Sequence, residues 1–330
     1  MSDLDIIIET LLTFDGISRK FVLPRIISKL RDVSYNGDTP HSLGEDSAAI
    51  LTGSNEFVLL TTDAIVEELC VNHPEAAGFN VVLANIMDIY AAGGTPTSFA
   101  VALSYSDEET GRLLLEGLIN GSHTFKVPIV RGHTNSKSTS TYVVGSATGT
   151  VKENQILTAG GAEEGDTLVL LFDRVGGRGE HYTLGWDSVT DRESSEVIKR
   201  LTVMNELAQE GLVNASKDVS VAGMIGTAGM LVEYSGVGGI IDLDIIRKSA
   251  PSGLDLLDWL RMYISLGFLI AIPVRNVPKV SRIAQDHEME AIRIGEVDSG
   301  ASLRLRMGDE EKVIFDFSKG PILTPRSSYR

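Results

Sequence analysis

Apolar residues dominate the segment Phe79–Pro96, FNVVLANIMDIYAAGGTP, and predict a helix around which the rest of the chain is organised. Gly93 and Gly94 end the apolar run, as glycines commonly end helices. Asn85 and Asp88 interrupt it three residues apart, so they share one helical face. A carboxylate on an otherwise apolar helix is costly to bury unless it is paired or binds a metal. The pattern favours a functional role for Asp88; the alternative is a buried polar pair satisfied by the neighbouring backbone.

The N-terminal half alternates between helical and extended patterns. Residues 4–33 have helical periodicity, with the basic turn GISRK between the segments Leu4–Thr13 and Phe21–Leu30. The turn-rich residues 35–43 follow. Strands are predicted in GEDSAAIL, FVLLTTDAIV, TSFAVALSYS, VPIVRGHTNS and TYVVGSATGTV, with a helix at 107–125. RGHTNS is interpreted as the loop that ends its strand, and Glu67 and Glu68 as a solvated loop. This strand–helix alternation is typical of an α/β domain.

The C-terminal half also shows mixed α/β character. We expect first a buried strand in DTLVLLF, then a glycine-rich loop at 176–187 and a helix at Ser194–Glu210. A polar turn KDVS then precedes a glycine-containing helix, and DLLDWLRMYISLGFLIAIPV forms a helix followed by a strand. A helix in VPKVSRIAQDHEM and strands in AIRIGEVDSG and ASLRLRM follow. The segment PILTPRSSYR is expected to be a loose tail.

The length of 330 residues exceeds the usual size of a single core and predicts two domains. We expect an N-terminal helical segment at 1–36, a first domain at 37–154, a second domain at 155–320 and a tail at 321–330.

The charge balance limits the possible partners. Lys and Arg number 29 and Asp and Glu 45, giving a net charge of −16 that argues against nucleic acid and anionic membranes. ATP remains compatible, because magnesium links carboxylates to phosphates. The single cysteine, Cys70, excludes an internal disulfide. The acidic N-terminal residues and the charges that interrupt Leu254–Ile272 favour a cytoplasmic protein without a signal peptide or membrane span.

Three further acidic positions lie in apolar or glycine-rich settings. Asp46 precedes an apolar strand, Asp63 ends a buried one, and Asp218 precedes a glycine-rich helix. Oxygen ligands are what magnesium prefers, so these positions and Asp88 are candidate ligands. The alternatives are an acidic turn at Asp46, a strand end capped by its own side chains at Asp63, and a helix N-cap at Asp218 or Ser220.

RGHTNS contributes candidates for phosphate binding and acid–base chemistry. Arg131, Thr134 and the local backbone are candidate phosphate ligands, and His133 is a candidate acid or base. A surface loop is the alternative interpretation. Lys20 in the GISRK segment is a further candidate phosphate ligand, against the alternative of a solvated basic turn.

Together these segments, in this order over roughly residues 16–297, resemble the AIR synthase superfamily: GEDSAAI, TTDAIV, NIMDIYAAGGTP, RGHTNS and KDVSVAGMIGT. That superfamily includes aminoimidazole ribonucleotide synthetase, FGAM synthetase, thiamine-monophosphate kinase, selenophosphate synthetase and a hydrogenase maturation dehydratase. The GISRK, KVPIVRGHTN and WLRMYISLGFLIAI segments are most similar to an uncharacterised AIR synthase-related branch that includes the methanogenesis marker 2 proteins.

The resemblance implies a two-domain fold, with an N-terminal α/β domain that forms a homodimer through its sheet and an α+β C-terminal domain. It implies ATP and Mg²⁺ as cofactors and a small-molecule oxygen as phosphoryl acceptor, through a kinase or a synthetase reaction. By position, the implied metal ligands are Asp46, Asp63, Asp88 and Asp218. The implied nucleotide contacts are Thr62, Asn85, Gly132, Thr134 and Lys20, and the candidate catalytic residues are His133, Asp88 and Arg131.

Two segments depart from the pattern of the thiamine-monophosphate kinases. Arg131-Gly132-His133 stands where those kinases have Gly-Gly-Asp, and RMYISLGF replaces their GGEDYEL-type segment. The missing acid keeps a second hypothesis open, namely a nucleotide-binding regulatory or assembly protein with reduced catalysis. A purely structural partner protein, the third hypothesis, would bind no nucleotide.

Overall fold

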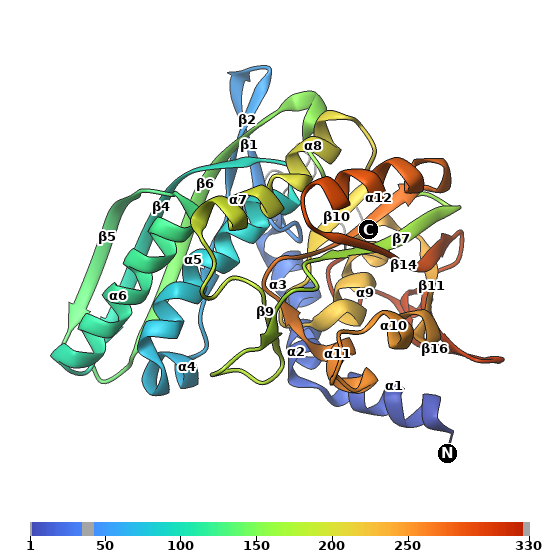
Figure 1. Cartoon of the computed structure of the whole chain (residues 1–330), viewed down its shortest axis with the longest axis horizontal. Helices are drawn as coiled ribbons and strands as arrows, with labels where there is room; N and C mark the ends of the chain where they lie inside the picture. Colours follow the sequence, from blue (N-terminus) through green and yellow to red (C-terminus); the bar gives the residue numbers. More distant parts are fainter. Residues whose placement is uncertain (1, 35–42, 326–330) are drawn as a thin grey trace.

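The computed structural model describes residues 2–34 and 43–325. It contains a six-stranded sheet in the N-terminal half, a seven-stranded sheet in the C-terminal half and a small three-stranded sheet (Figure 1). The predicted combination of an α/β and an α+β domain is confirmed. Among the described residues, no helix is long and apolar enough to cross a membrane.

The N-terminal sheet has the strand order β1-β2-β6-β4-β5, and β3 also pairs with β6. The strands are β1 (Ala48–Ser54), β2 (Glu56–Leu60), β3 (Asp63–Ala64), β4 (Thr95–Tyr105), β5 (Ile129–Ser136) and β6 (Tyr142–Lys152). The helices of this half are α4 (Glu67–Asn72), α5 (Pro74–Ala91) and α6 (Glu108–Phe125). Only β4 and β5 run parallel, because α6 connects them as a crossover.

Helices α5 and α6 pack closely through glycines. A Cβ atom at Gly117 would lie 1.9 Å from the Glu75 carbonyl oxygen, and one at Gly78 would lie 2.2 Å from the Leu114 oxygen. Backbone approach of this kind requires residues without side chains. The predicted helix of Phe79–Pro96 is therefore the second part of α5, which ends just before Gly93 with its positive φ of 75°.

In the part of the chain that the structure describes, helices cover one face of the N-terminal sheet and leave the other face open. Phe99, Val101 and Leu103 of β4 are buried in the core with α5 and α6. Ala100 and Ala102, which alternate with them, are half-buried on the opposite face. Successive strand residues point to opposite faces, so the sheet has a packed inner face and an open outer face.

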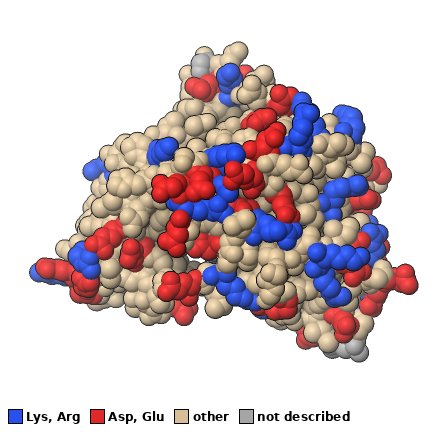
Figure 2. All heavy atoms as spheres, in the orientation of Figure 1, with Lys and Arg blue, Asp and Glu red and all other residues tan. Residues whose placement is uncertain are grey.

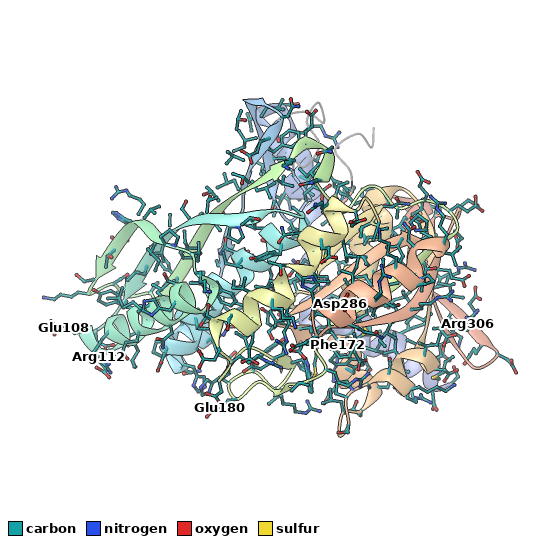
Figure 3. All side chains as sticks on the ribbon, turned by 45° about the horizontal axis from the view of Figure 1, so that its top comes forward. Glu108, Arg112, Phe172, Glu180, Asp286 and Arg306 are labelled. Carbon is teal, nitrogen blue, oxygen red and sulfur yellow. The ribbon has the colours of Figure 1, made fainter. Side chains whose placement is uncertain are left out.

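The C-terminal sheet has the order β10-β13-β7-β14-β11-β15-β16. Its strands are β7 (Asp166–Phe172), β10 (Ala215–Asp218), β11 (Gly238–Asp242), β13 (Gly267–Pro273), β14 (Glu290–Asp298), β15 (Ser302–Met307) and β16 (Glu310–Asp316). The small sheet joins β8 (Gly177–Arg178), β9 (Gly185–Asp187) and β12 (Tyr263–Ile264). In Figure 3, Phe172 marks the end of β7 and Glu180 marks the loop between β8 and β9.

Helices cover both faces of the C-terminal sheet. The helices of the N-terminal segment and of the C-terminal half are α1 (Asp3–Thr13), α2 (Asp15–Ser18), α3 (Leu23–Leu30), α7 (Ser194–Leu201), α8 (Val203–Gln209), α9 (Gly223–Ser235), α10 (Leu243–Ser249), α11 (Leu256–Arg261) and α12 (Val277–Asp286). Short 3-10 turns are η1 (Arg19–Val22), η2 (Arg31–Val33), η3 (Glu153–Gln155), η4 (Val274–Asn276) and η5 (Phe317–Lys319). Val169 and Leu171 of β7 pack into the core shared with α5, α7 and α12, whereas Leu168 and Leu170 pack with α1 and α9. Every residue of β7 is buried as a result.

The surface carries mixed charge. Figure 2 shows Lys and Arg interspersed with Asp and Glu on the face that is drawn. Lys199 of α7 and Glu288, in the turn after α12, form an ion pair at 2.8 Å.

Several expectations about local structure were wrong. GISRK is not a turn but forms the end of α2 and the start of η1, and Glu67 and Glu68 open helix α4. The helix expected at Ser194–Glu210 is two helices that break at Thr202. The glycine-rich loop at 176–187 contains the strands β8 and β9.

The end of the chain also differs from the expected loose tail. Glu233 of α9 is buried and accepts hydrogen bonds from the backbone N–H groups of Ile322, Leu323 and Thr324 at 2.6, 2.8 and 2.6 Å. Leu323 is fully buried against α9 as well. The rest of that tail, 326–330, and most of the turn predicted at 35–43 lie outside the described residues.

Candidate active site

Three carboxylates from separate parts of the chain meet between the two sheets. Asp46 lies in the loop before β1, Asp88 in the last turn of α5 and Asp218 at the end of β10. One oxygen from each lies within 4.8 Å of the others. We call these three residues the acidic cluster. Three of the four predicted metal ligands are therefore brought together although they are 42 or more positions apart in the sequence.

The loop before β1 is held by three consecutive side chains. Glu45 accepts hydrogen bonds from Thr158 Oγ1 at 2.8 Å and Ala159 N at 2.9 Å, in the segment that connects the two sheets. Ser47 Oγ donates to the Asp88 carbonyl oxygen at 3.0 Å, which fixes the loop on α5. Asp46, between them, reaches β10. The position of Asp46 is thus determined by contacts with both halves of the chain.

Lys217 connects the loop to β10. Its Nζ forms an ion pair with Asp46 Oδ1, and the Asp218 backbone N–H donates to Asp46 Oδ2 at 3.3 Å. The Lys217 side chain is only 4% exposed. Burial alone would lower the pKa of its ammonium group, but the charges of Asp46, Asp218 and Glu45 raise the pKa above its usual value. Lys217 therefore stays charged inside the protein.

The carboxylates repel one another. Burial raises the pKa of Asp88 well above its usual value, and Asp63, Asp218 and Asp46 raise it further. Burial and the charge of Asp46 raise the pKa of Asp218 to about 8, although Lys217 opposes this. Asp63 is thus close enough to act on both residues, although it is not within the 4.8 Å group. Below these raised pKa values, a divalent cation that binds Asp88 and Asp218 would have to displace protons.

Lys20 lies near the acidic cluster, because the charges of Lys217, Asp218 and Asp63 act on it. Burial and the charges of Arg19 and Lys217 lower the pKa of the Lys20 ammonium, while Asp218 and Asp63 oppose that shift. Lys20 forms no ion pair with a described residue.

Helix α2 fixes the position of the segment that carries Lys20. A Cβ atom at Gly16 would lie 2.0 Å from the Val221 oxygen, and Ile17 is fully buried beside Gly226 of α9. The α2–η1 segment is therefore fixed against the C-terminal half by a contact that only glycine allows at position 16.

The RGHTNS residues do not join the cluster. They form β5, an exposed edge strand, rather than a loop. The register pairs Arg131 with Ala100 and His133 with Ala102, on the outer face of the sheet. Gly132 and Thr134, which alternate with them along β5, pair with inner-face positions of β4 but are exposed at the sheet edge.

Thr62 also lies on the outer face, where its Oγ1 lies 2.9 Å from Ser146 Oγ. Within one chain the sheet separates Thr62, Arg131 and His133 from α5 and Asp88. Within one chain the structure therefore does not bring these three residues together with the carboxylates. Strand alternation is the reason, because it sends neighbours such as Thr62 and Asp63 to opposite faces.

Asn85 fits the alternative interpretation weighed from the sequence. It is fully buried, accepts from Thr61 Oγ1 at 2.7 Å and donates through Nδ2 to the Val81 oxygen at 2.8 Å. The side chain joins α5 to the end of β2 and leaves no surface for a nucleotide. The N-cap alternative for Asp218 does not hold, because α9 has Ala222 at its N-cap and Asp218 ends a buried strand.

The sequence interpretation missed three residues at the site. Lys217 directly precedes Asp218, and a lysine within the otherwise buried pattern ASKD was the available signal. Glu45 was taken only as part of an acidic turn. Tyr263 lies on β12, and burial together with the charges of Asp218 and Asp187 raises its pKa well above the usual value. Nothing in the periodicity of RMYISLGF distinguishes Tyr263 from a core residue.

The donor set of the cluster fits a hard divalent cation. All three groups are carboxylates, and hard cations such as Mg²⁺ take oxygen ligands. The uncompensated burial of Asp88 and Asp218 gives an independent reason, because a bound cation removes the repulsion between them.

Two family models match the chain. Residues 44–151 match "AIR synthase related protein, N-terminal domain" and residues 163–308 match "AIR synthase related protein, C-terminal domain". The chain therefore belongs to the AIR synthase-related family, as its motifs predicted. The uncharacterized protein MJ0640 of Methanocaldococcus jannaschii is 32% identical over 315 residues, which cover 95% of this chain and 97% of that protein.

Solved structures share the fold. T. maritima PurL complexed with ATP has a TM-score of 0.71 and 16% identity, covering 92% of this chain and 54% of that one. AaThiL complexed with AMPPCP and TMP has a TM-score of 0.63 and 18% identity, covering 88% and 96%. The chain thus spans about half the length of PurL. At these identities the similarity concerns the fold alone.

Proposed function

We propose that this protein is a magnesium-dependent, ATP-binding enzyme that phosphorylates an oxygen of a small-molecule substrate, as a kinase or as a synthetase with a phosphorylated intermediate. The observation that carries the proposal is the acidic cluster, three carboxylate oxygens within 4.8 Å of one another. Its place in a family fold that PurL and AaThiL share, in structures with ATP and AMPPCP, supports a nucleotide at this site.

The residues divide into two groups in this proposal. Asp46, Asp88 and Asp218 would hold Mg²⁺, with Asp63 beside them. Bound magnesium supplies charge neutralisation for the phosphate oxygens during transfer. Lys20 has no ionic partner among the described residues and supplies a positive charge for the nucleotide phosphates. Phosphoryl transfer requires mainly positioning and electrostatic stabilisation, which this arrangement of acids and lysines provides.

The open outer face of the N-terminal sheet supports a homodimer. Small and aliphatic residues occupy it, including Ala100, Ala102 and the 39% exposed Leu60. Two such faces packed together would bring Arg131 and His133 to a subunit interface, where their predicted roles would require a partner chain. Light scattering should give a dimer, and Ala102→Arg should produce a monomer, since a buried arginine without a partner is costly. A wild-type monomer would contradict this part of the proposal.

Thermal unfolding with and without MgATP tests nucleotide binding. A ligand at about one hundred times its Kd should stabilise the protein by about 2.7 kcal/mol. Asp88→Asn should remove most of the magnesium-dependent part of this stabilisation, while the exposed Asp309→Asn serves as the matched control. If MgATP leaves the unfolding temperature of the wild type unchanged, the proposed function is wrong.

A second candidate function rests on the segment RGHTNS, residues 131–136. Positions 131–133 carry no acid, and Arg131 and His133 lie away from the cluster. These observations favour a nucleotide-binding regulatory or assembly protein with reduced turnover. Nucleotide binding without ADP production, tested with candidate small-molecule acceptors, would support this alternative, and substrate-dependent ADP production would exclude it.

A further inference from the structure

Lys217 differs from Arg200, another well-buried cation that forms an ion pair. Arg200 is 4% exposed, and its donors contact Asp173, the Glu196 carbonyl oxygen and Glu288. Every nitrogen of that guanidinium therefore has an acceptor, as expected for a purely structural pair.

The ammonium group of Lys217 has only one acceptor among the described residues. It is as buried as Arg200, at 4% exposed, yet its single hydrogen bond is to Asp46 Oδ1. An ammonium group has three N–H donors, so two remain unused beside the acidic cluster. A buried ammonium group with unsatisfied donors is costly unless the site uses them.

The charges around the cluster are not balanced by the protein. The carboxylates Asp46, Asp63, Asp88 and Asp218 outnumber the ammonium groups of Lys217 and Lys20, and the buried Glu45 lies next to them. Lys217 already occupies one oxygen of Asp46, an oxygen that a second divalent ion would need.

We propose that Lys217 is a built-in cation of the acidic cluster: it takes the place of a second divalent ion on Asp46 and directs its two unused N–H donors to the nucleotide phosphates. This inference rests on the proposed function, because it specifies how many divalent ions that site takes and which residue assists them. Lys217 is in this view a positioning residue for Asp46 and a phosphate ligand.

Replacing Lys217 should have opposite effects on two ligands. In Lys217→Met, a side chain of similar length without charge frees Asp46, so Mn²⁺ without nucleotide should bind about tenfold tighter or as a second ion. ATP in excess EDTA should bind about tenfold more weakly, because a phosphate contact is lost. Lys217→Arg keeps the charge and should keep one Mn²⁺ per chain. Damage to the fold would weaken the binding of both Mn²⁺ and ATP, so it cannot produce a gain for Mn²⁺ together with a loss for ATP.

The experiment uses the full chain. Free Mn²⁺ is followed by electron paramagnetic resonance, and ATP in EDTA by calorimetry, with circular dichroism to confirm folding. One Mn²⁺ per wild-type chain and the opposite shifts in Lys217→Met are expected. Any other result in a folded Lys217→Met overturns the inference. If neither Lys217→Met nor Lys217→Gln folds, the test is the number of Mn²⁺ ions that the wild type binds without nucleotide. More than one Mn²⁺ per chain would then overturn the inference about Lys217. Absence of any Mn²⁺ binding to the wild type would instead refute the proposed function.

Discussion

Raising the pH in the absence of divalent metal should destabilise this protein, because the folded acidic cluster holds protons that the unfolded chain releases. The pKa of Asp218 is raised to about 8 by burial and by Asp46. In the unfolded chain an aspartate titrates near pKa 3.9. Between these values the folded state binds more protons than the unfolded state. Stability is therefore complete below about pH 4 and is lost as the pH rises towards about 8.

The size of the loss in unfolding free energy follows from the shift in the pKa of Asp218. One site with these two pKa values loses about 1.4 kcal/mol of unfolding free energy for each pH unit between them. From about pH 5 to about pH 7 this amounts to about 3 kcal/mol for an isolated group. Asp218 is 7% exposed, so solvent screening reduces the value little, but it shares its protons with Asp88. A net loss of roughly 2 kcal/mol, or about 5 °C in Tm, is the expected outcome.

The assay is thermal unfolding in EDTA at constant ionic strength across this pH range. Asp218→Asn removes one of the titrating groups and should reduce the slope by about half, leaving the contribution of Asp88. Asp309→Asn, an exposed aspartate in the turn before β16, should leave the slope unchanged. A wild-type stability that increases with pH between about 5 and 8, or an unchanged slope in Asp218→Asn, would refute this account of the cluster.

Three further predictions concern the cluster and its supports. Binding of Mn²⁺ near pH 6 should release about one proton per ion, measured by calorimetry in buffers of different ionisation enthalpy; no release would mean that the carboxylates are already ionised. Gly16→Ala should cost roughly 2–3 kcal/mol and weaken ATP binding, because the added Cβ meets the Val221 oxygen at 2.0 Å and displaces the segment of Lys20; an unchanged melting curve would contradict this. Glu233→Gln should cost roughly 1–3 kcal/mol, since three N–H groups of the chain end lose a charged acceptor. The exposed Glu180→Gln is its control, and equal stability of the two variants would argue against it.

Much of the architecture could be predicted because the local signals agreed with the fold. The apolar run ending at Gly93 gave the position of α5, and the alternation in TYVVGSATGTV matches β6. RGHTNS was missed as a strand because polar residues and glycine are common in loops, while pairing with β4 decides the conformation here. Tertiary contacts overrode local preference in GISRK as well, where packing on α9 supports a helical conformation.

The site could be predicted residue by residue but not as an arrangement. The cost of burying Asp88 could be predicted from the apolar residues of its helix, and the structure shows that Asp46 and Asp218 are its neighbours. The sequence did not show to which side of the sheet each side chain at a strand end points. Thr62 was therefore grouped with Asp63, although the two point to opposite sides of the sheet. Lys217 could not be placed either, because one sequence position does not show which acid a buried lysine reaches.

The three anchored side chains of the loop before β1 have a consequence for how the molecule unfolds. Glu45 binds the connecting segment, Asp46 binds β10, and Ser47 binds α5. Separation of the two halves must therefore disrupt the loop, and disruption of the loop removes a carboxylate from the cluster. An ion held by all three acids would be lost when either half unfolds, so it would couple them into one cooperative transition. Without the ion the two halves remain joined by the core that they share, so the bound ion should make the unfolding transition seen by calorimetry sharper.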